Sequence, residues 1–245
     1  MNPPYEDQDD EREFASGSDY DNIPAEDPQE SSTRITKSTP EIIDLEEGHD
    51  WTMEEEAIDF YGLTHNIQEI ISFIGDDVSR EGLVDTPRRV VESWRELYSG
   101  YKADIASMMT TFDKEQYDQM VVLQNIEFFS TCEHHMLPFT GIAHVAYIPD
   151  KRIIGISKLA RLVDAFSRRL QNQERITTQV TAALDTFLEP KGSACIIEAR
   201  HHCMGCRGTK KPHAIMKTSS LRGAFKEDAA TRSELFRMLE NRSHD

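Results

Sequence analysis

Residues 120–150 are MVVLQNIEFFSTCEHHMLPFTGIAHVAYIPD, and the pattern of this segment predicts β-structure. Its runs 120–129 and 139–148 are rich in Val, Ile, Phe and Tyr and are bounded by turn residues, which is typical of strands. A comparable run follows at 193–201, and residues 213–220 can form a further strand. The sequence therefore predicts two pairs of strands in the second half of the chain.

Helical patterns surround these strands. Residues 53–75 place apolar side chains at a spacing of about 3.6 residues. Thr86 is expected to cap a second helix, because a proline suited to the first helical turn follows it. Further helices are expected from Ser157, over 174–188 and over 228–241. The predicted order of elements is helices, a strand pair, two helices, a strand pair and a last helix. This order predicts an α+β fold with an antiparallel sheet.

Charge divides the chain into two parts. The 245 residues carry a net charge of -17, and sixteen Asp and Glu against three Lys and Arg lie in residues 1–50. This acidic segment is poor in apolar residues and is expected to be a disordered tail, either solubilising or partner-binding. The folded part is expected at 51–245, with N-terminal helices over 51–112 and the core over 118–245. Acidity that belongs mostly to the tail says little about the substrate.

Composition excludes several classes of protein. No run approaches the roughly 18 apolar residues of a membrane span, and the N-terminus lacks the basic and apolar regions of a signal peptide. No basic stripe indicates nucleic-acid binding. Four cysteines in a chain of this length do not form a secreted disulfide framework, so metal binding or catalysis is the better interpretation. We expect a soluble cytoplasmic protein that binds neither nucleic acid nor membrane.

Two short clusters predict a metal site. The first is Cys132-Glu133-His134-His135, and the second, His201-His202-Cys203, follows about seventy residues later. In a turn or helical start, Cys132 and His135 face the same way. On a strand, Cys203 would share a face with His201. Thiolates and imidazoles are the ligands that zinc favours, so Cys132, His135 and Cys203 are the expected ligands.

The imidazoles left over favour a catalytic site over a structural one. Three protein ligands leave a fourth zinc position for water, whose pKa zinc lowers to about 7. His134 and His201 would lie beside it as proton-transfer groups, and His202 is expected to be a bystander. The alternative is a closed structural site of three cysteines and one histidine, in which Cys206 of the Cys-x-x-Cys pair is the fourth ligand.

A second group of residues is basic. Ser157, Lys158 and Arg161 lie at the start of a predicted helix, Arg207 follows the metal cysteine, and Arg89 lies in an early helix. A helix N-terminus with cations around it suits phosphate. For any one of these residues, ordinary solvated charge is the simpler interpretation, but their position around the metal-bearing segments favours a binding role.

Gln173 and Glu174 begin the second long helix. Glu174 can interact with the helix dipole, or its carboxylate can accept hydrogen bonds from the N–H groups of a purine. The residues alone do not decide between these two roles.

Several motifs in order resemble one known family. They are DTPRRV (85–90), STCEHHMLPF (130–139), GISKLARLVDAFSRRLQNQERIT (155–177), H-x-C-x-x-x-R-G (201–208) and TSSLRGAFKED (218–228). Together they make the chain resemble GTP cyclohydrolase I of the zinc-dependent type, over about residues 55–242. Five separated motifs in the right order are more specific than any one of them.

The resemblance implies a fold, an assembly and a reaction. The fold would be the tunnelling fold, an antiparallel sheet with paired helices, whose subunits close into rings. Family members form a homodecamer of two pentamers with active sites at subunit interfaces. The reaction converts GTP and water to 7,8-dihydroneopterin triphosphate and formate, the first step of pterin and folate biosynthesis, and uses one Zn²⁺ per subunit.

By motif position, the resemblance implies roles for individual residues. The implied zinc ligands are Cys132, His135 and Cys203, and the implied proton-transfer residues are His134 and His201. Glu174, with Gln173, would anchor guanine and ribose, and Ser157 would assist near the ribose or phosphates. The implied triphosphate contacts are Lys158, Arg161, Arg207 and Arg89. Hydrolytic attack at C8 of the purine would open the imidazole ring, release formate and precede rearrangement of the ribose.

The chain departs from the family pattern at two places. The family often has a proline before its Gln-x-Gln-Glu-Arg motif, where this chain has none in 169–172. Cys206 occupies a position that the family does not use as a ligand, and we hypothesise that it forms a disulfide with Cys203 when metal is lost. Two other functions remain as alternatives. One is an enzyme that acts on another pterin or deazapurine, such as the nitrile reductase related to this family, against which the complete Cys-His-Cys set argues. The other is a non-catalytic ring scaffold with a structural zinc, whose tail recruits partners.

Overall fold

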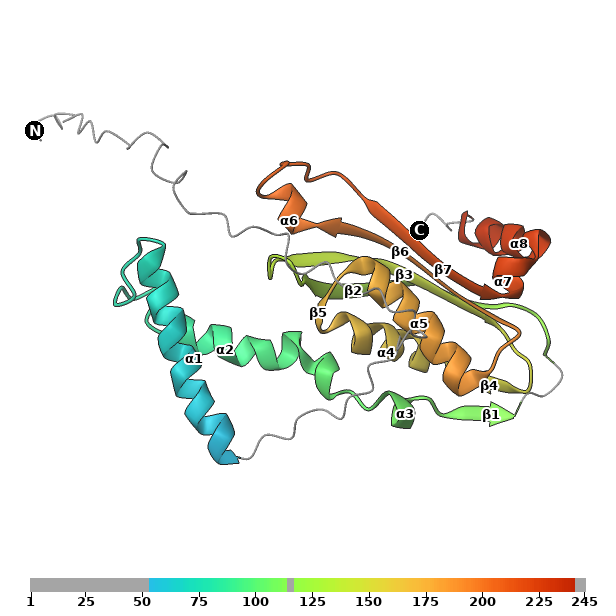
Figure 1. The fold of residues 1–245 in the computed structure, drawn as a ribbon, viewed down its shortest axis with the longest axis horizontal. Coiled ribbons are helices and arrows are strands. Elements are labelled where there is room, and N and C mark those ends of the chain that lie inside the picture. Colours follow the sequence, from blue (N-terminus) through green and yellow to red (C-terminus); the bar gives the residue numbers. More distant parts are fainter. Residues whose placement is uncertain (1–52, 114–116, 241–245) are drawn as a thin grey trace, which may run out of the picture. The chain divides into compact units, whose positions relative to one another are not determined.

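The computed structural model describes residues 53–113 and 117–240 (Figure 1). The expected tail at 1–50 lies outside these residues. The helices are α1 (Met53–Phe73), α2 (Thr86–Leu97), the 3-10 helix η2 (Ser99–Lys102), α3 (Ile105–Met108), α4 (Ile156–Ser167), α5 (Gln173–Leu188), α6 (His202–Gly205), α7 (Ala224–Glu227) and α8 (Ala229–Glu240). The strands are β1 (Thr111–Asp113), β2 (Val121–Cys132), β3 (Pro138–Ile148), β4 (Arg152–Ile154), β5 (Leu170–Gln171), β6 (Gly192–His201) and β7 (Met216–Gly223).

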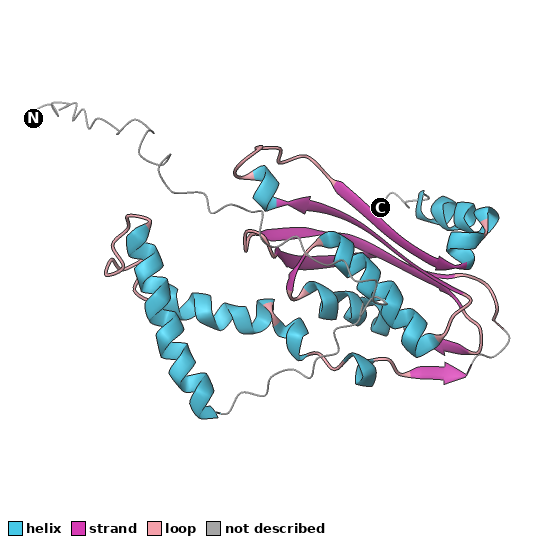
Figure 2. Ribbon diagram, in the orientation of Figure 1, coloured by secondary structure: helices cyan, strands magenta, loops and turns pink. Residues whose placement is uncertain are grey.

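A five-stranded sheet forms the centre of the fold, in the order β5-β2-β3-β6-β7 (Figure 2). Its long strands pair antiparallel, and the short β5 joins β2 in parallel. The pairing of Phe139 with His201 brings the start of β3 beside the end of β6. The end of β2 leads through a short turn into the start of β3, so the two histidine-containing clusters of the sequence meet at one end of the sheet.

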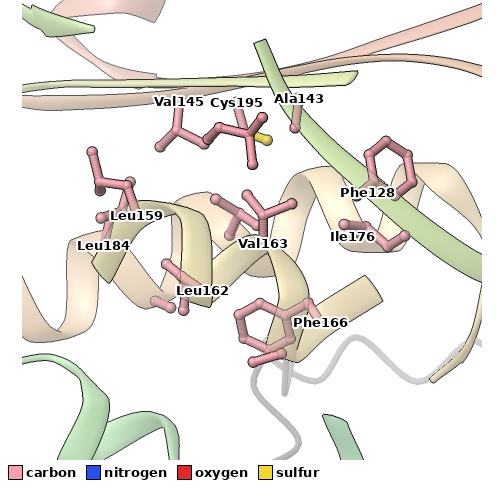
Figure 3. Packing of buried hydrophobic residues seen from close by; sticks show 14 of the residues in the cluster. Phe128, Ala143, Val145, Leu159, Leu162, Val163, Phe166, Ile176, Leu184 and Cys195 are labelled. Atoms are coloured by element: carbon pink, nitrogen blue, oxygen red, sulfur yellow. The ribbon is translucent and has the colours of Figure 1, made fainter. Parts of the chain in front are cut away.

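The main core lies between the sheet and the helices α4 and α5, which cover one of its faces (Figures 1 and 3). Val163 and Phe166 of α4, Leu184 of α5 and Val145 of β3 are fully buried there. Burial of such side chains stabilises the fold by roughly 1.5–3 kcal/mol each. This core holds α5 against the sheet, so the first residues of α5 are fixed in relation to the strand ends.

Two smaller clusters complete the packing. On the other face of the sheet, Phe225 of α7 and Leu235 of α8 pack with Ala194 and Ile196 of β6. In the N-terminal helices, Ile67 and Ile71 of α1 pack against Val91 of α2, whereas Ile70 and Phe73, which belong to the same expected apolar pattern, are exposed. None of the helices among the described residues is long and apolar enough to cross a membrane.

The predicted elements agree with the structure apart from local details. The strands expected at 139–148 and 193–201 correspond to β3 and β6 within a residue. The expected cap by Thr86 is wrong, because Asp85 occupies the N-cap position and makes no side-chain capping bond. The placement of Cys203 on a strand is also wrong: β6 ends at His201, and Cys203 lies in the short helix α6.

Candidate metal centre and active site

Three expected ligands converge at the end of the sheet. Cys132 is the last residue of β2, His135 lies in the turn that follows it, and Cys203 lies in α6. Their ligand atoms all lie within 4.8 Å of one another, and the Cys132 Sγ to His135 Nδ1 distance is 3.7 Å. Two segments seventy residues apart thus supply one set of soft ligands, as the sequence predicted.

The donor set fits zinc. In a tetrahedral site with Zn–S of about 2.3 Å and Zn–N of about 2.0 Å, neighbouring ligand atoms lie roughly 3.5–3.8 Å apart, which matches the measured separation of Cys132 and His135. Burial raises the pKa of the Cys203 thiol, and the neighbouring Cys132 thiol raises it further. A divalent cation would offset both effects, because metal binding favours the thiolates.

Backbone hydrogen bonds close the turn that carries His134 and His135. The Cys132 N–H donates to the Leu137 carbonyl at 2.8 Å, and the Met136 N–H donates to the Cys132 carbonyl at 2.8 Å. Met136 takes a left-handed conformation with φ of 51°, which is unfavourable for a residue with a Cβ atom. The turn therefore depends on contacts with neighbouring elements to keep its shape.

The two histidines expected to move protons have different surroundings. His134 has an exposed imidazole, and its Nδ1 lies 3.8 Å from Cys132 Sγ. His201 is half-buried and stacks on Phe139 with ring centroids 4.5 Å apart. Burial lowers the pKa of His201, against the opposing effect of the Glu174 carboxylate. A neutral imidazole at position 201 and a solvent-facing one at position 134 are suited to accepting and delivering protons.

Gln173 lies behind His201 and not at the exposed surface. Its side chain is fully buried. Its Nε2 donates to the carbonyls of Ile197 and Met216 at 3.0 and 3.1 Å and to the Thr218 hydroxyl, and its Oε1 lies 3.0 Å from His201 Nε2. The carboxamide is bonded to protein partners, and the expected anchoring of guanine and ribose by Glu174 with Gln173 stays a prediction. The adjacent Glu174 is exposed.

Cys206 and His202 stay outside the ligand group. Both are exposed, and within the described ranges the group of converging ligands contains Cys132, His135 and Cys203 without Cys206. The geometry therefore favours three protein ligands over the closed structural site. The expectation that His202 is a bystander stays a prediction.

Most of the expected phosphate-binding cations are available for a ligand. Ser157, Lys158 and Arg161 lie in the first two turns of α4, and Arg207 follows α6. Within residues 53–113 and 117–240, no side-chain hydrogen bond or ion pair involves Lys158, Arg161 or Arg207. Arg89, in contrast, lies in α2 and bonds to Asp85 at 3.1 Å.

Sequence analysis missed three residues beside the site. Asn172, the N-cap of α5, accepts a hydrogen bond from the Arg175 N–H at 2.8 Å and donates from Nδ2 to Glu133 at 2.9 Å. Arg175 pairs with the same Glu133 carboxylate through both terminal nitrogens. These bonds hold the pKa of Glu133 below its usual range, chiefly through Arg175. All three lie inside the quoted motifs 130–139 and 155–177, but the sequence does not indicate that they contact one another.

The comparison with known families agrees with this geometry. The model of the family described as GTP cyclohydrolase I matches residues 63–240, which include every described site residue named above. The chain belongs to the GTP cyclohydrolase I family. Its fold is the tunnelling fold that the resemblance implied, with an antiparallel sheet and paired helices.

Curated relatives extend the match over most of the described chain. GTP cyclohydrolase 1 of Wolinella succinogenes is 52% identical over 183 residues, which are 74% of this chain and 96% of that protein. The enzyme of the same name from Helicobacter pylori strain HPAG1 is 49% identical over 69% of this chain and 94% of that one. The apo structure of the archaeosine synthase QueF-Like matches with a TM-score of 0.36 and 14% identity, over 42% of this chain and 93% of that one.

Proposed function

We propose that this family member is a zinc-dependent GTP cyclohydrolase I that converts GTP and water to 7,8-dihydroneopterin triphosphate and formate. The observation that carries the proposal is the convergence of Cys132, His135 and Cys203 within 4.8 Å, beside two further imidazoles. A purely structural zinc site closes with four protein ligands, whereas a catalytic one keeps a position open. This reaction is the first step of pterin and folate biosynthesis.

Cys132, His135 and Cys203 would hold one Zn²⁺ per chain. When bound, zinc supplies Lewis acidity and lowers the pKa of water, which makes hydrolysis at C8 of the purine feasible at neutral pH. The surplus histidines then act on protons near the metal. His134 is exposed and free to approach the substrate, and His201 is held from behind.

The hydrogen bonds of Gln173 define the proton-accepting nitrogen of His201. Because its Nε2 donates to two backbone carbonyls, its Oε1 must be the atom that faces His201. His201 therefore carries its proton on Nε2 and leaves Nδ1 as an acceptor. In this proposal Gln173 acts on the substrate through His201, and Glu174 alone accepts hydrogen bonds from guanine.

Cations around the site would bind the triphosphate. Lys158 and Arg161 project from the first turns of α4, with Ser157 beside them, and Arg207 follows the metal cysteine. Guanidinium and ammonium groups without a protein partner are suited to phosphate oxygens. Binding energy gained there orients the purine for reaction without taking part in the chemistry.

The proposed assembly is a cytoplasmic homodecamer of two pentamers. Arg89 lies in α2, which packs on α1 and η2, whereas the other site residues come from the sheet end and from α4 to α6. Active sites at subunit interfaces would give Arg89 access to the triphosphate bound by another copy of the chain.

A turnover assay tests the proposed function directly. Zinc-loaded protein is expected to release formate from GTP and to yield a product that becomes a fluorescent pterin on oxidation. His134→Ala should lower kcat by roughly 100-fold or more, because a proton-transfer group is lost. His202→Ala removes a neighbouring exposed imidazole and should leave kcat unchanged. Zinc bound at one per chain without formate release would instead indicate a metal-bearing scaffold.

Lys158→Ala tests the phosphate contacts. This change is expected to raise the KM for GTP by roughly tenfold and to change kcat much less, since a charge-assisted bond of about 1.5–3 kcal/mol to a remote part of the substrate is lost. Lys151→Ala, an exposed lysine in the turn before β4, is the matched control and should leave KM unchanged. Equal KM values for the two variants would remove Lys158 from the substrate site.

A further inference from the structure

The turn that carries two metal-site histidines is attached to α5 through Glu133. The Glu133 backbone N–H donates to the Gln171 carbonyl at 3.0 Å. The Glu133 side chain is only 26% exposed and accepts from Asn172 and from both terminal nitrogens of Arg175. A bidentate ion pair between a guanidinium and a carboxylate fixes the relative orientation of the two groups as well as their distance. Residues 171–175 thus hold this turn at several points.

The same helical turn also holds the second half of the metal site. Gln173 contacts His201, two residues before Cys203, and bonds to the carbonyls of Ile197 in β6 and Met216 in β7. The first turn of α5 therefore contacts both ligand-bearing segments, one through Arg175 and one through Gln173. Glu174, the proposed guanine anchor, lies between these two contacts in the sequence.

The exposed imidazoles have little packing of their own to orient them. His134 and His135 are both exposed, and the turn includes the left-handed Met136. An attachment that fixes the neighbouring Glu133 therefore adds to the backbone hydrogen bonds of the turn in restraining where His135 points. Groups that hydrogen-bond to metal ligands without touching the metal typically change metal affinity by roughly 10–100-fold when they are altered.

We propose that Glu133 and Arg175 are a positioning pair, which sets the turn carrying Cys132 and His135 against the first turn of α5 and so aligns the metal with the substrate-binding end of that helix. Only one part of this proposal, the alignment of the metal with the substrate-binding end of α5, rests on the proposed function. The pair acts through its neighbours, among them His134, whose Nε2 lies 3.8 Å from Glu133 Oε1. The competing interpretation is a partly exposed ion pair that contributes modestly to stability and nothing else.

The test compares conservative variants by metal binding. Glu133→Gln keeps an acceptor for Asn172 and removes the negative charge. Arg175→Lys keeps the positive charge and removes the second of the two hydrogen bonds to Glu133. We expect each to weaken Zn²⁺ binding roughly tenfold in competition with a chelator and to change the absorption bands of the Co²⁺-loaded protein. The double variant should bind Zn²⁺ no more weakly than the single variant with the lower affinity, because both substitutions remove the same interaction.

A second ion pair on the same helix supplies the matched control. Asp185 of α5 pairs with Arg222 of β7 at 3.2 Å, with side chains 35% and 33% exposed. Asp185→Asn should lower the melting temperature about as much as Glu133→Gln while Zn²⁺ affinity and the Co²⁺ spectrum stay as in the wild type. Unchanged metal binding in Glu133→Gln and Arg175→Lys, or an equal loss in Asp185→Asn, would overturn the positioning role.

Steady-state kinetics add a readout that tests alignment with the substrate. In Glu133→Gln, we expect kcat to fall roughly tenfold with the KM for GTP within about twofold, since the phosphate contacts lie on other elements. A rise in KM with kcat unchanged would contradict the alignment. If the wild type turned over no GTP, the proposed function would fail, whereas the zinc and cobalt measurements would still decide the positioning role.

Discussion

Cys203→Ala is expected to abolish both metal binding and turnover. Cys203 is the proposed ligand from α6, and its Sγ lies within 4.8 Å of the ligand atoms of Cys132 and His135. With two ligands left, Zn²⁺ affinity should fall by more than about 100-fold, and formate release from GTP by roughly 1,000-fold or more. Zinc stoichiometry by elemental analysis and formate release are measured on the same sample.

Cys206→Ala is the matched control for this change. Cys206 lies three residues further on, is exposed and stays outside the converging group. We expect this variant to keep one Zn²⁺ per chain and its full turnover. Loss of zinc in Cys206→Ala would show that Cys206 is a fourth ligand and would favour the scaffold interpretation over the hydrolase.

The strands and helices of this chain were largely predictable because their patterns are local. Residues 139–148 are rich in Val, Ile, Phe and Tyr, and β3 follows this run closely as a strand in the middle of the sheet. The two-residue β5 and the short β1 carry no such pattern. These elements exist because of tertiary pairing, which periodicity does not report.

The convergence of Cys132, His135 and Cys203 was predictable, although the expected placement of Cys203 on a strand was wrong. Strand alternation placed Cys203 beside His201, but the strand ends at His201 and Cys203 reaches the site from α6. Chemistry and motif spacing were sufficient to identify Cys203. The buried role of Gln173 was not predictable, because a glutamine at a helix start carries no sign of the two strands that its amide bridges.

Glu133 and Arg175 show a second limit of sequence reasoning. Each is a charged residue within a quoted motif, and they are forty-two positions apart. Their pairing appears only when β2 and α5 pack on the same core. Residues that orient other residues are recognised from contacts, whereas residues that bind metal are recognised from their chemical type.

Gly141→Ala is expected to be the most damaging conservative change in the sheet. Gly141 of β3 pairs with Ala199 of β6, and a Cβ atom at this position would lie 2.0 Å from the Glu198 carbonyl oxygen and 2.7 Å from Ala199 Cα. Both obstacles are backbone atoms, so β3 and β6 must separate. We expect a loss of about 3 kcal/mol in unfolding free energy and a melting temperature lower by roughly 10 °C.

Gly62→Ala is the matched control, since a Cβ atom there meets nothing within 4 Å in the exposed middle of α1. Alanine favours helix over glycine by about 0.5–1 kcal/mol, so this variant should melt slightly higher than the wild type. In Gly141→Ala the strain acts two residue pairs from the contact of Phe139 with His201. Turnover at a temperature where the variant stays folded should therefore fall as well. A Gly141→Ala protein with wild-type stability would show that the two strands approach less closely than described.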